Sequence, residues 1–97
     1  MTAPRMDWPA SMTAYGVTVQ RETLEEAWEN WWGPWTSSQR GWLLMKELRE
    51  VALWVTYHPD ARNVSTGVWS RIADRMLQRA RMAGVIRFNG KEWEKVE

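Results

Sequence analysis

The sequence of 97 residues contains no cysteine and only one histidine, and these two absences exclude several kinds of chemistry. Without cysteine the chain forms no disulfide, holds no metal through thiolates and has no thiol nucleophile. One histidine, His58, provides neither a Ser-His-acid triad nor a cluster of metal ligands, so we expect it to cap a helix end or face solvent. A glycine-rich phosphate loop is also missing. We therefore expect no enzymatic activity, cofactor or metal.

Long apolar runs are absent as well. No segment approaches the roughly 20 apolar residues that cross a bilayer, and the first twelve residues hold Asp7 and two prolines where a signal peptide would be apolar. We expect a cytoplasmic protein with no membrane partner. The length suits a single domain over residues 1–97, and nine tryptophans and six methionines supply large side chains for its core.

Charge is distributed unevenly, although the formal net charge is only +1. Residues 1–40 contain three basic and five acidic side chains, a net charge of −2. Residues 62–91 contain seven basic side chains and one acidic residue, Asp74, a net charge of +6. The C-terminal third of the chain is therefore the part suited to an acidic partner.

The N-terminal third gives a weak strand signal followed by a helix signal. Residues 1–20 include the β-branched and aromatic stretch 14–19, which predicts a short strand or an ordered arm. Thr23 followed by Glu26 matches a capping box and predicts a helix over residues 24–32.

A second helix is predicted over residues 38–57. Gly33 and Pro34 end the first helix, because glycine accepts a left-handed cap and proline cannot continue the hydrogen-bond ladder. Polar residues that can cap the next helix follow them: Thr36, Ser37 and Ser38. Apolar residues then recur at three- and four-residue steps: Leu44, Met45, Leu48, Val51, Ala52 and Val55. The predicted stop is His58-Pro59-Asp60.

The third helix has the strongest periodic signal. Ser65 or Thr66 caps it, and its apolar stripe consists of Val68, Trp69, Ile72, Ala73, Met76, Leu77 and Ala80. Arg71, Arg75 and Gln78 lie opposite that stripe, with Arg79 and Arg81 at its flanks. The exposed ridge of this helix is therefore predicted to be cationic.

A β-hairpin follows. Gly84 is placed as the helix C-cap, and Asn89-Gly90 between two alternating segments is typical of a type I′ turn, which needs positive φ at both central residues. The expected fold is mostly α with a small β-hairpin (α+β). It has an arm or strand over 1–20, two Trp-rich helices over 23–57, and a basic helix plus hairpin over 64–96.

Residues 65–96, above all the stretch from Arg71 through Ala83-Gly84-Val85-Ile86 to Asn89-Gly90, resemble the end of a winged helix-turn-helix DNA-binding domain. The resemblance implies three helices and a C-terminal wing, double-stranded DNA as partner, and a role as a regulator or accessory factor. The family places a short helix and a tight turn before its recognition helix, whereas here a long helix and a Pro59 loop precede it.

The resemblance also implies which residues bind the nucleic acid. Those nearest the base edges would be Thr66, Ser70, Arg71 and Arg75, with Arg79 nearer the backbone. Arg87 and Lys91 beside the hairpin turn would contact the phosphates or the minor groove, and Arg62 belongs to the same basic region. The simpler interpretation of the ridge is a solvated helix face.

The tryptophans suggest an alternative function. Trp28, Trp69 and at least one of Trp31 and Trp32 are expected in the core. An exposed Trp32, Trp35 or Trp42 would instead anchor a host protein or a second copy of the chain, since tryptophan is enriched at binding hot spots. Small size and abundant tryptophan are similar to those of phage- or plasmid-type interaction modules. Stacking on single-stranded nucleic acid is a third option.

Overall fold

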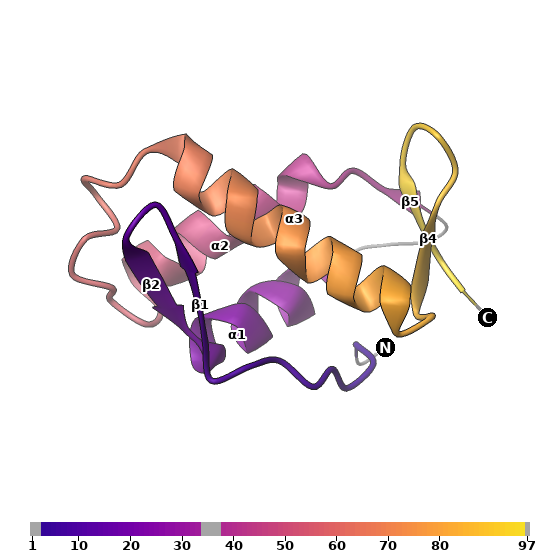
Figure 1. Ribbon diagram of the computed structural model, residues 1–97, viewed down its shortest axis with the longest axis horizontal. Coiled ribbons are helices and arrows are strands. Elements are labelled where there is room, and N and C mark those ends of the chain that lie inside the picture. The colour runs from indigo at the N-terminus through magenta and orange to yellow at the C-terminus, as the bar shows by residue number, and fades with distance from the viewer. Residues whose placement is uncertain (1–2, 34–37, 97) are drawn as a thin grey trace.

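The N-terminal residues form an extended arm and then a hairpin of strands β1 (Ser11–Ala14) and β2 (Val17–Gln20). The computed structural model describes residues 3–33 and 38–96 (Figure 1). Ala14 pairs with Val17, and the two turn residues between them, Tyr15 and Gly16, have φ values of 50° and 80°. Positive φ at both positions is the pattern of a type I′ turn. The region predicted as an arm or a short strand therefore contains an arm and two strands.

Helix α1 (Arg21–Trp32) begins directly after β2, so the predicted capping box is wrong. Arg21 N donates to the Ala10 carbonyl (2.9 Å), and this backbone contact satisfies an N–H group at the start of the helix. Thr23 lies inside the first turn, buried, with its hydroxyl 2.8 Å from that of Thr56. Gly33 is helical, with φ −54°, and not left-handed as predicted.

Helix α2 (Trp42–Trp54) is shorter at both ends than the predicted 38–57. Ser38 does not cap it, because β3 (Ser38–Gln39) pairs with the C-terminal hairpin and Gly41 is the N-cap. The predicted caps Thr36 and Ser37 lie outside the described residues. Val55, expected in the core, is 50% exposed just beyond the helix end.

Helix α3 (Thr66–Met82) forms as predicted after Ser65. All seven residues of the predicted stripe are buried: Val68, Trp69, Ile72, Ala73, Met76, Leu77 and Ala80. Gly84 was predicted as the C-cap, but the C-cap is Ala83; Gly84 is the next residue, with a φ of 78° in the left-handed conformation that favours glycine. The local pattern was therefore sufficient to define this helix.

The C-terminal hairpin consists of β4 (Ile86–Phe88) and β5 (Trp93–Lys95), in a three-stranded antiparallel sheet of order β3-β5-β4. The predicted type I′ turn is wrong, because only Gly90 has positive φ in the loop between them. Asn89 shapes the loop instead: its Oδ1 accepts from Lys91 N (2.9 Å) and Glu92 N (2.7 Å). Such side-chain acceptance is how asparagine stabilises turns.

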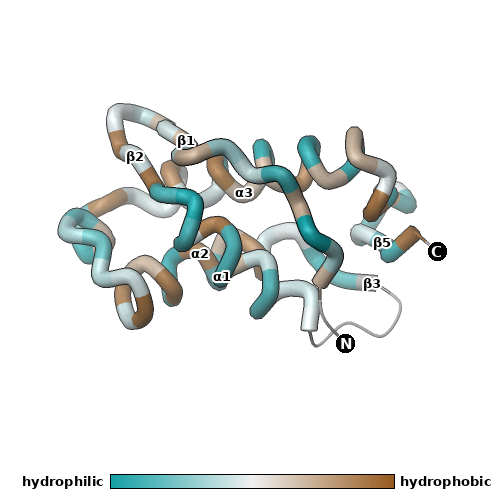
Figure 2. Tube along the Cα trace, turned by 90° about the horizontal axis from the view of Figure 1, so that it is seen from below, coloured by the Kyte–Doolittle hydropathy of each residue, from teal (hydrophilic) through white to brown (hydrophobic). Residues whose placement is uncertain are grey.

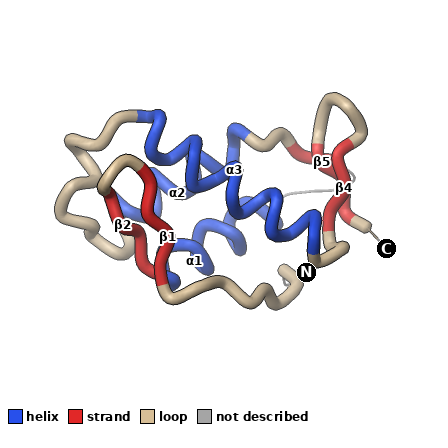
Figure 3. Tube along the Cα trace, viewed as in Figure 1, coloured by secondary structure: helices blue, strands red, loops and turns tan. Residues whose placement is uncertain are grey.

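The fold is α+β, as predicted, with one sheet at each end of the molecule (Figure 3). Helix α2 packs against both α1 and α3. Polar and apolar residues alternate along the helices (Figure 2), and the buried residues of each helix lie on one face. The core is rich in indole. Trp28 contacts Trp8, Trp31 and Trp32 at ring-centroid distances of 5.4, 5.2 and 5.6 Å. Trp69 is buried as well.

Candidate nucleic-acid interface

The face of α3 opposite its buried stripe is a row of exposed polar side chains. The row consists of Ser70, Arg71, Asp74, Gln78 and Arg81. Thr66, also a predicted contact, is exposed at the first residue of the helix. Seventeen residues make the helix about 25 Å long, enough to lie along a major groove. We call the five residues from Ser70 to Arg81 named above the α3 row.

Two weak pairs join side chains within the α3 row. Arg71 Nη1 lies 4.0 Å from Asp74 Oδ2, one turn on, and Arg81 Nε donates to Gln78 Oε1 (3.0 Å). Both members of the Arg71–Asp74 pair are more than half exposed, so water screens their attraction. An incoming ligand therefore separates them at little cost. Arg81 was predicted at a flank of the apolar stripe and not as a contact, and the structure adds it to the row.

Arg75 and Arg79 lie on the side of α3 that faces the N-terminal segment. Arg75 Nη1 donates to the Thr13 carbonyl, and Arg79 Nε donates to the Asp7 carbonyl (3.1 Å). Both side chains remain exposed, and a guanidinium has five N–H groups, so each keeps donors for a further acceptor. The segment thus orients two of the predicted DNA contacts without neutralising them.

In the C-terminal hairpin, Arg87 is paired within the protein. Its Nε lies 3.0 Å from Glu94 Oε1, and Asn89 Nδ2 donates to Glu94 Oε2 (3.1 Å). The hydrogen bonds from Asn89 and Arg87 favour the charged carboxylate and hold the pKa of Glu94 below its ordinary value of 4.5. Arg87 is thereby fixed along the strand, with 70% of its side chain exposed.

Lys91 and Arg40 flank the tip of the hairpin. Lys91 is exposed, and among the described residues its side chain has no carboxylate partner. Arg40 Nε lies 3.5 Å from Glu92 Oε2, because the pairing of β3 with β5 brings this residue to the hairpin. No local pattern in the sequence predicts that placement. Arg40 is therefore a basic residue of this surface that the sequence prediction missed.

Arg62, the remaining predicted contact, lies in the loop before α3. Its guanidinium carbon lies 5.4 Å from the centroid of the Trp54 ring, at the far end of α2. This cation–π contact covers one face of the Arg62 guanidinium, and the Arg62 side chain is still exposed to solvent. Arg62 is thus separate from the α3 row.

The three tryptophans proposed as partner anchors differ in the structure. Trp32 is only 6% exposed, within the indole cluster and with Lys95 Nζ 4.6 Å from its ring centroid, so its prediction as an exposed anchor is wrong. Trp35 lies outside the described residues. Trp42 is 55% exposed and borders a hollow of about 210 Å³ between the start of α2 and α3. Trp54, which was not predicted, is 58% exposed.

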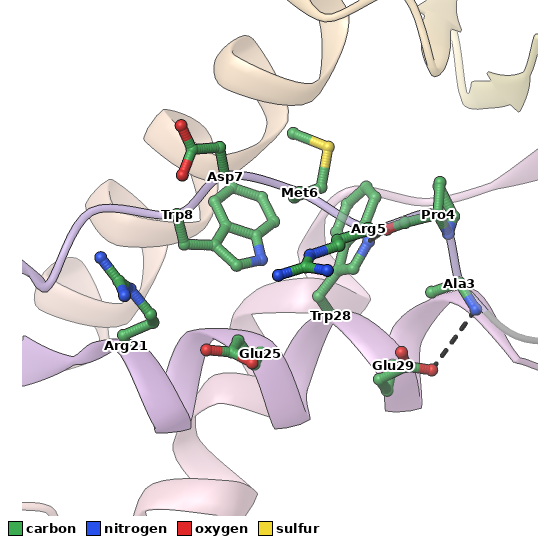
Figure 4. Close-up of a pocket in the computed structure, with 10 residues that line it drawn as sticks. All are labelled: Ala3, Pro4, Arg5, Met6, Asp7, Trp8, Arg21, Glu25, Trp28 and Glu29. Atoms are coloured by element: carbon green, nitrogen blue, oxygen red, sulfur yellow. Dashed lines mark hydrogen bonds between the residues drawn. The ribbon is translucent and has the colours of Figure 1, made fainter.

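A cleft of about 560 Å³ separates the N-terminal arm from α1 (Figure 4). Its floor is apolar, because Trp8 and Trp28 are both 2% exposed there, and Trp28 Nε1 donates to the Pro4 carbonyl (3.2 Å). Charges of both signs surround it: Arg5, Asp7, Arg21, Glu25 and Glu29. Side chains of both charges do not favour one class of ligand. The cleft lies where Trp8 of the arm packs against Trp28 of α1.

His58 has a structural place next to β2. Its Nδ1 accepts from Asp60 N (3.1 Å), so the ring proton is on Nε2, which lies 2.8 Å from the Thr18 carbonyl and donates to it. The ring also meets Trp69 edge-on, with centroids 6.3 Å apart. The histidine therefore ties the loop after α2 to the N-terminal hairpin.

Metal-binding clusters of three or more His, Asp or Glu side chains are not found within residues 3–33 and 38–96. In the same residues, no helix combines the length and apolarity of a bilayer crossing. Comparisons of the chain with protein-family models, with curated proteins and with solved structures found no match.

Proposed function

We propose that the protein is a small DNA-binding protein, a regulator or accessory factor in which α3 enters the major groove and the β4–β5 hairpin lies beside it as a wing. The observation that carries the proposal is the α3 row, a line of exposed polar and charged side chains on a helix of sufficient length. A cytoplasmic location accords with this function and with the cysteine-free sequence.

The α3 row has the chemistry for direct readout. Arg71 can donate two hydrogen bonds to guanine, Gln78 can pair with adenine, and Asp74 can accept from the cytosine amino group. Because Arg71 and Asp74 are held only by a weak exposed pair, both are available to base edges.

Backbone contacts would come from the residues around the row. Arg75 and Arg79 are oriented along one side of α3, and Lys91 and Arg87 extend from the wing. Cations along one side of a groove-binding helix and beyond its end would position the helix against the phosphates.

The order of elements supports the proposal. From α1 onward the described chain runs helix, strand, helix, helix and hairpin, and β3 pairs with β5 of the hairpin. This order is similar to that of winged helix domains. The Pro59 loop still distinguishes the chain, because α2 and α3 are joined by residues 55–65 and not by a tight turn.

Fluorescence anisotropy with random duplex DNA across a salt series tests the proposal. We expect binding at low salt, with log affinity falling linearly as log salt rises. Arg71→Ala should weaken binding about tenfold, while Arg5→Ala, an equal change of charge in the arm, should leave it within about twofold. Absence of binding by the unchanged protein at low salt would refute the function.

The second candidate is a protein-interaction module, favoured by the exposure of Trp42 and Trp54. An exposed indole beside a hollow is a typical anchor site, and a host protein or a second copy of the chain would cover it. Size-exclusion chromatography with light scattering, and affinity capture with tagged protein, test both partners. Trp42→Ser should abolish the complex, and a complex unchanged by this substitution would contradict the module.

A further inference from the structure

We infer that the β1–β2 hairpin is a second DNA contact, in which the phenol of Tyr15 donates to the sugar–phosphate backbone beside the groove that α3 occupies. The inference rests on the proposed function and adds a contact far from the C-terminal wing. Its evidence is the position, the rigidity and the surface chemistry of the hairpin.

The hairpin lies against α3. Strand β1 packs on the helix, and the hydrogen bond from Arg75 to the Thr13 carbonyl joins one of the proposed DNA contacts to the strand. The turn between β1 and β2 is at the periphery of the molecule, whereas the wing lies beyond the other end of α3 (Figures 1 and 2). A duplex seated on the α3 row would therefore have one hairpin near each end of the helix.

The hairpin is also fixed in place. Its inward side chains Met12, Ala14 and Val19 are 8%, 3% and 0% exposed. On the other strand, the Thr18 carbonyl accepts from His58 Nε2 (2.8 Å). A surface held in this way loses little conformational freedom when it binds.

The outward side of the hairpin offers hydroxyl groups without charge. Residues 11–20 contain no acidic side chain that would repel phosphate and no basic one. Thr13 and Thr18 are exposed with their hydroxyls 2.9 Å apart, and Tyr15 at the tip is 79% exposed. Hydroxyls of threonine and tyrosine are regular donors to phosphate oxygens.

Tyrosine at position 15 does not favour the conformation of the turn. Its φ of 50° is one that bulky side chains rarely adopt, and asparagine before glycine is the preferred pair in a type I′ turn. The ring gains nothing from burial in return, since most of it faces solvent. Strained residues cluster at sites of ligand contact, and Tyr15 combines this strain with a place on the hairpin that packs against α3.

Two matched substitutions test the inference. Tyr15→Asn creates the preferred Asn-Gly turn, so the hairpin keeps its conformation while losing the phenol. Tyr57→Asn is the control, because Tyr57 has almost the same φ (52°) and exposure (74%) but lies in the loop after α2. Both variants are compared with the unchanged protein for duplex affinity by anisotropy across a salt series.

We expect Tyr15→Asn to weaken binding about tenfold at every salt concentration, with an unchanged slope of log affinity against log salt. The slope is unchanged because a neutral phenol displaces no condensed cation, whereas Lys91→Ala, which removes a proposed phosphate contact, should make the slope shallower. Binding by the unchanged protein together with unaltered binding by Tyr15→Asn overturns this inference and leaves the proposed function standing. An equal loss in Tyr57→Asn also overturns it. No binding by the unchanged protein overturns both.

Discussion

Arg75, in the middle of α3, donates a hydrogen bond to the backbone carbonyl of Thr13, a residue on the first strand of the chain. The contact gives Arg75 two roles, since the same guanidinium fastens the N-terminal hairpin and faces the proposed DNA. Substitutions at Arg75 therefore affect the hairpin as well as any phosphate contact, and Arg71 is the cleaner probe of binding.

The first prediction concerns this fastening. In Arg75→Ala, backbone amides of β1 and β2 should exchange with deuterium about fivefold faster than in the unchanged protein, because one hydrogen bond of about 1 kcal/mol is lost. Hydrogen exchange followed by NMR measures the effect. Arg71→Ala is the control, and equal protection of the hairpin amides in both variants would show that Arg75 does not hold the strand.

The second prediction concerns the buried Thr23. Its hydroxyl lies 2.8 Å from that of Thr56, which can in turn donate to the Val51 carbonyl (3.4 Å). Thr23→Val should lower the free energy of unfolding by about 1 kcal/mol, because Thr56 loses a donor in a half-buried site. Urea denaturation measures this value. Thr13→Val is the control, because it removes a hydrogen bond of similar length between the exposed hydroxyls of Thr13 and Thr18. It should change the free energy of unfolding by less than about 0.5 kcal/mol.

The third prediction concerns acid and the C-terminal wing. The pKa of Glu94 is lowered on folding by the hydrogen bonds from Asn89 and Arg87. A carboxylate whose pKa is lowered on folding stabilises the fold at pH values above its pKa in the unfolded chain. This contribution is lost as the pH falls through its pKa in the folded protein. The hairpin should therefore loosen as the pH falls below about 4.5. NMR titration of the Asn89 side-chain amide follows it, and Glu94→Gln should lack the transition.

The fourth prediction compares two glycines. A Cβ on Gly41 would lie 3.0 Å from Leu77 Cδ1 and 3.1 Å from Trp93 Nε1, so Gly41→Ala should destabilise the protein by about 1–3 kcal/mol. A Cβ on Gly67, in the first turn of α3, meets nothing closer than 3.6 Å. Gly67→Ala should stabilise by about 0.5–1 kcal/mol through helix propensity. Thermal unfolding measures both effects. A higher melting temperature in Gly41→Ala would contradict the predicted steric clash with Leu77 and Trp93.

The parts of the fold that depend on local pattern could be predicted from the sequence. The apolar stripe of α3 is correct at every residue, and the C-terminal hairpin forms where its turn signal lies. Strand β3 could not be predicted, because Ser38 and Gln39 have no strand propensity and are defined by pairing with Glu94 and Trp93. Thr23 was misassigned for a similar reason, since its partner Thr56 is distant in sequence.

Turn type was predictable only in part. The Asn89-Gly90 sequence marked a real hairpin but not its geometry, because Asn89 uses its side chain to bond the following amides. The positive-φ pair occurs instead at Tyr15-Gly16, where the sequence lacks the usual asparagine. A helical wheel predicted that the arginines of α3 are exposed, but it placed Arg75 opposite the apolar stripe, whereas Arg75 bonds the N-terminal hairpin. It also could not show that Arg79 bonds the arm or that Lys95 of β5 lies over the Trp32 ring.

Strand β5 lies between β3 and β4, although it is the last described element of the chain. During synthesis β3 and β4 both leave the ribosome before β5, so neither strand has its pairing partner until residues 93–95 emerge. The three-stranded sheet therefore closes only once residues 93–95 can pair, and not stepwise along the chain. Loss of β5 alone would therefore leave both β3 and β4 without a pairing partner, whereas loss of either neighbour would leave one pair of strands intact.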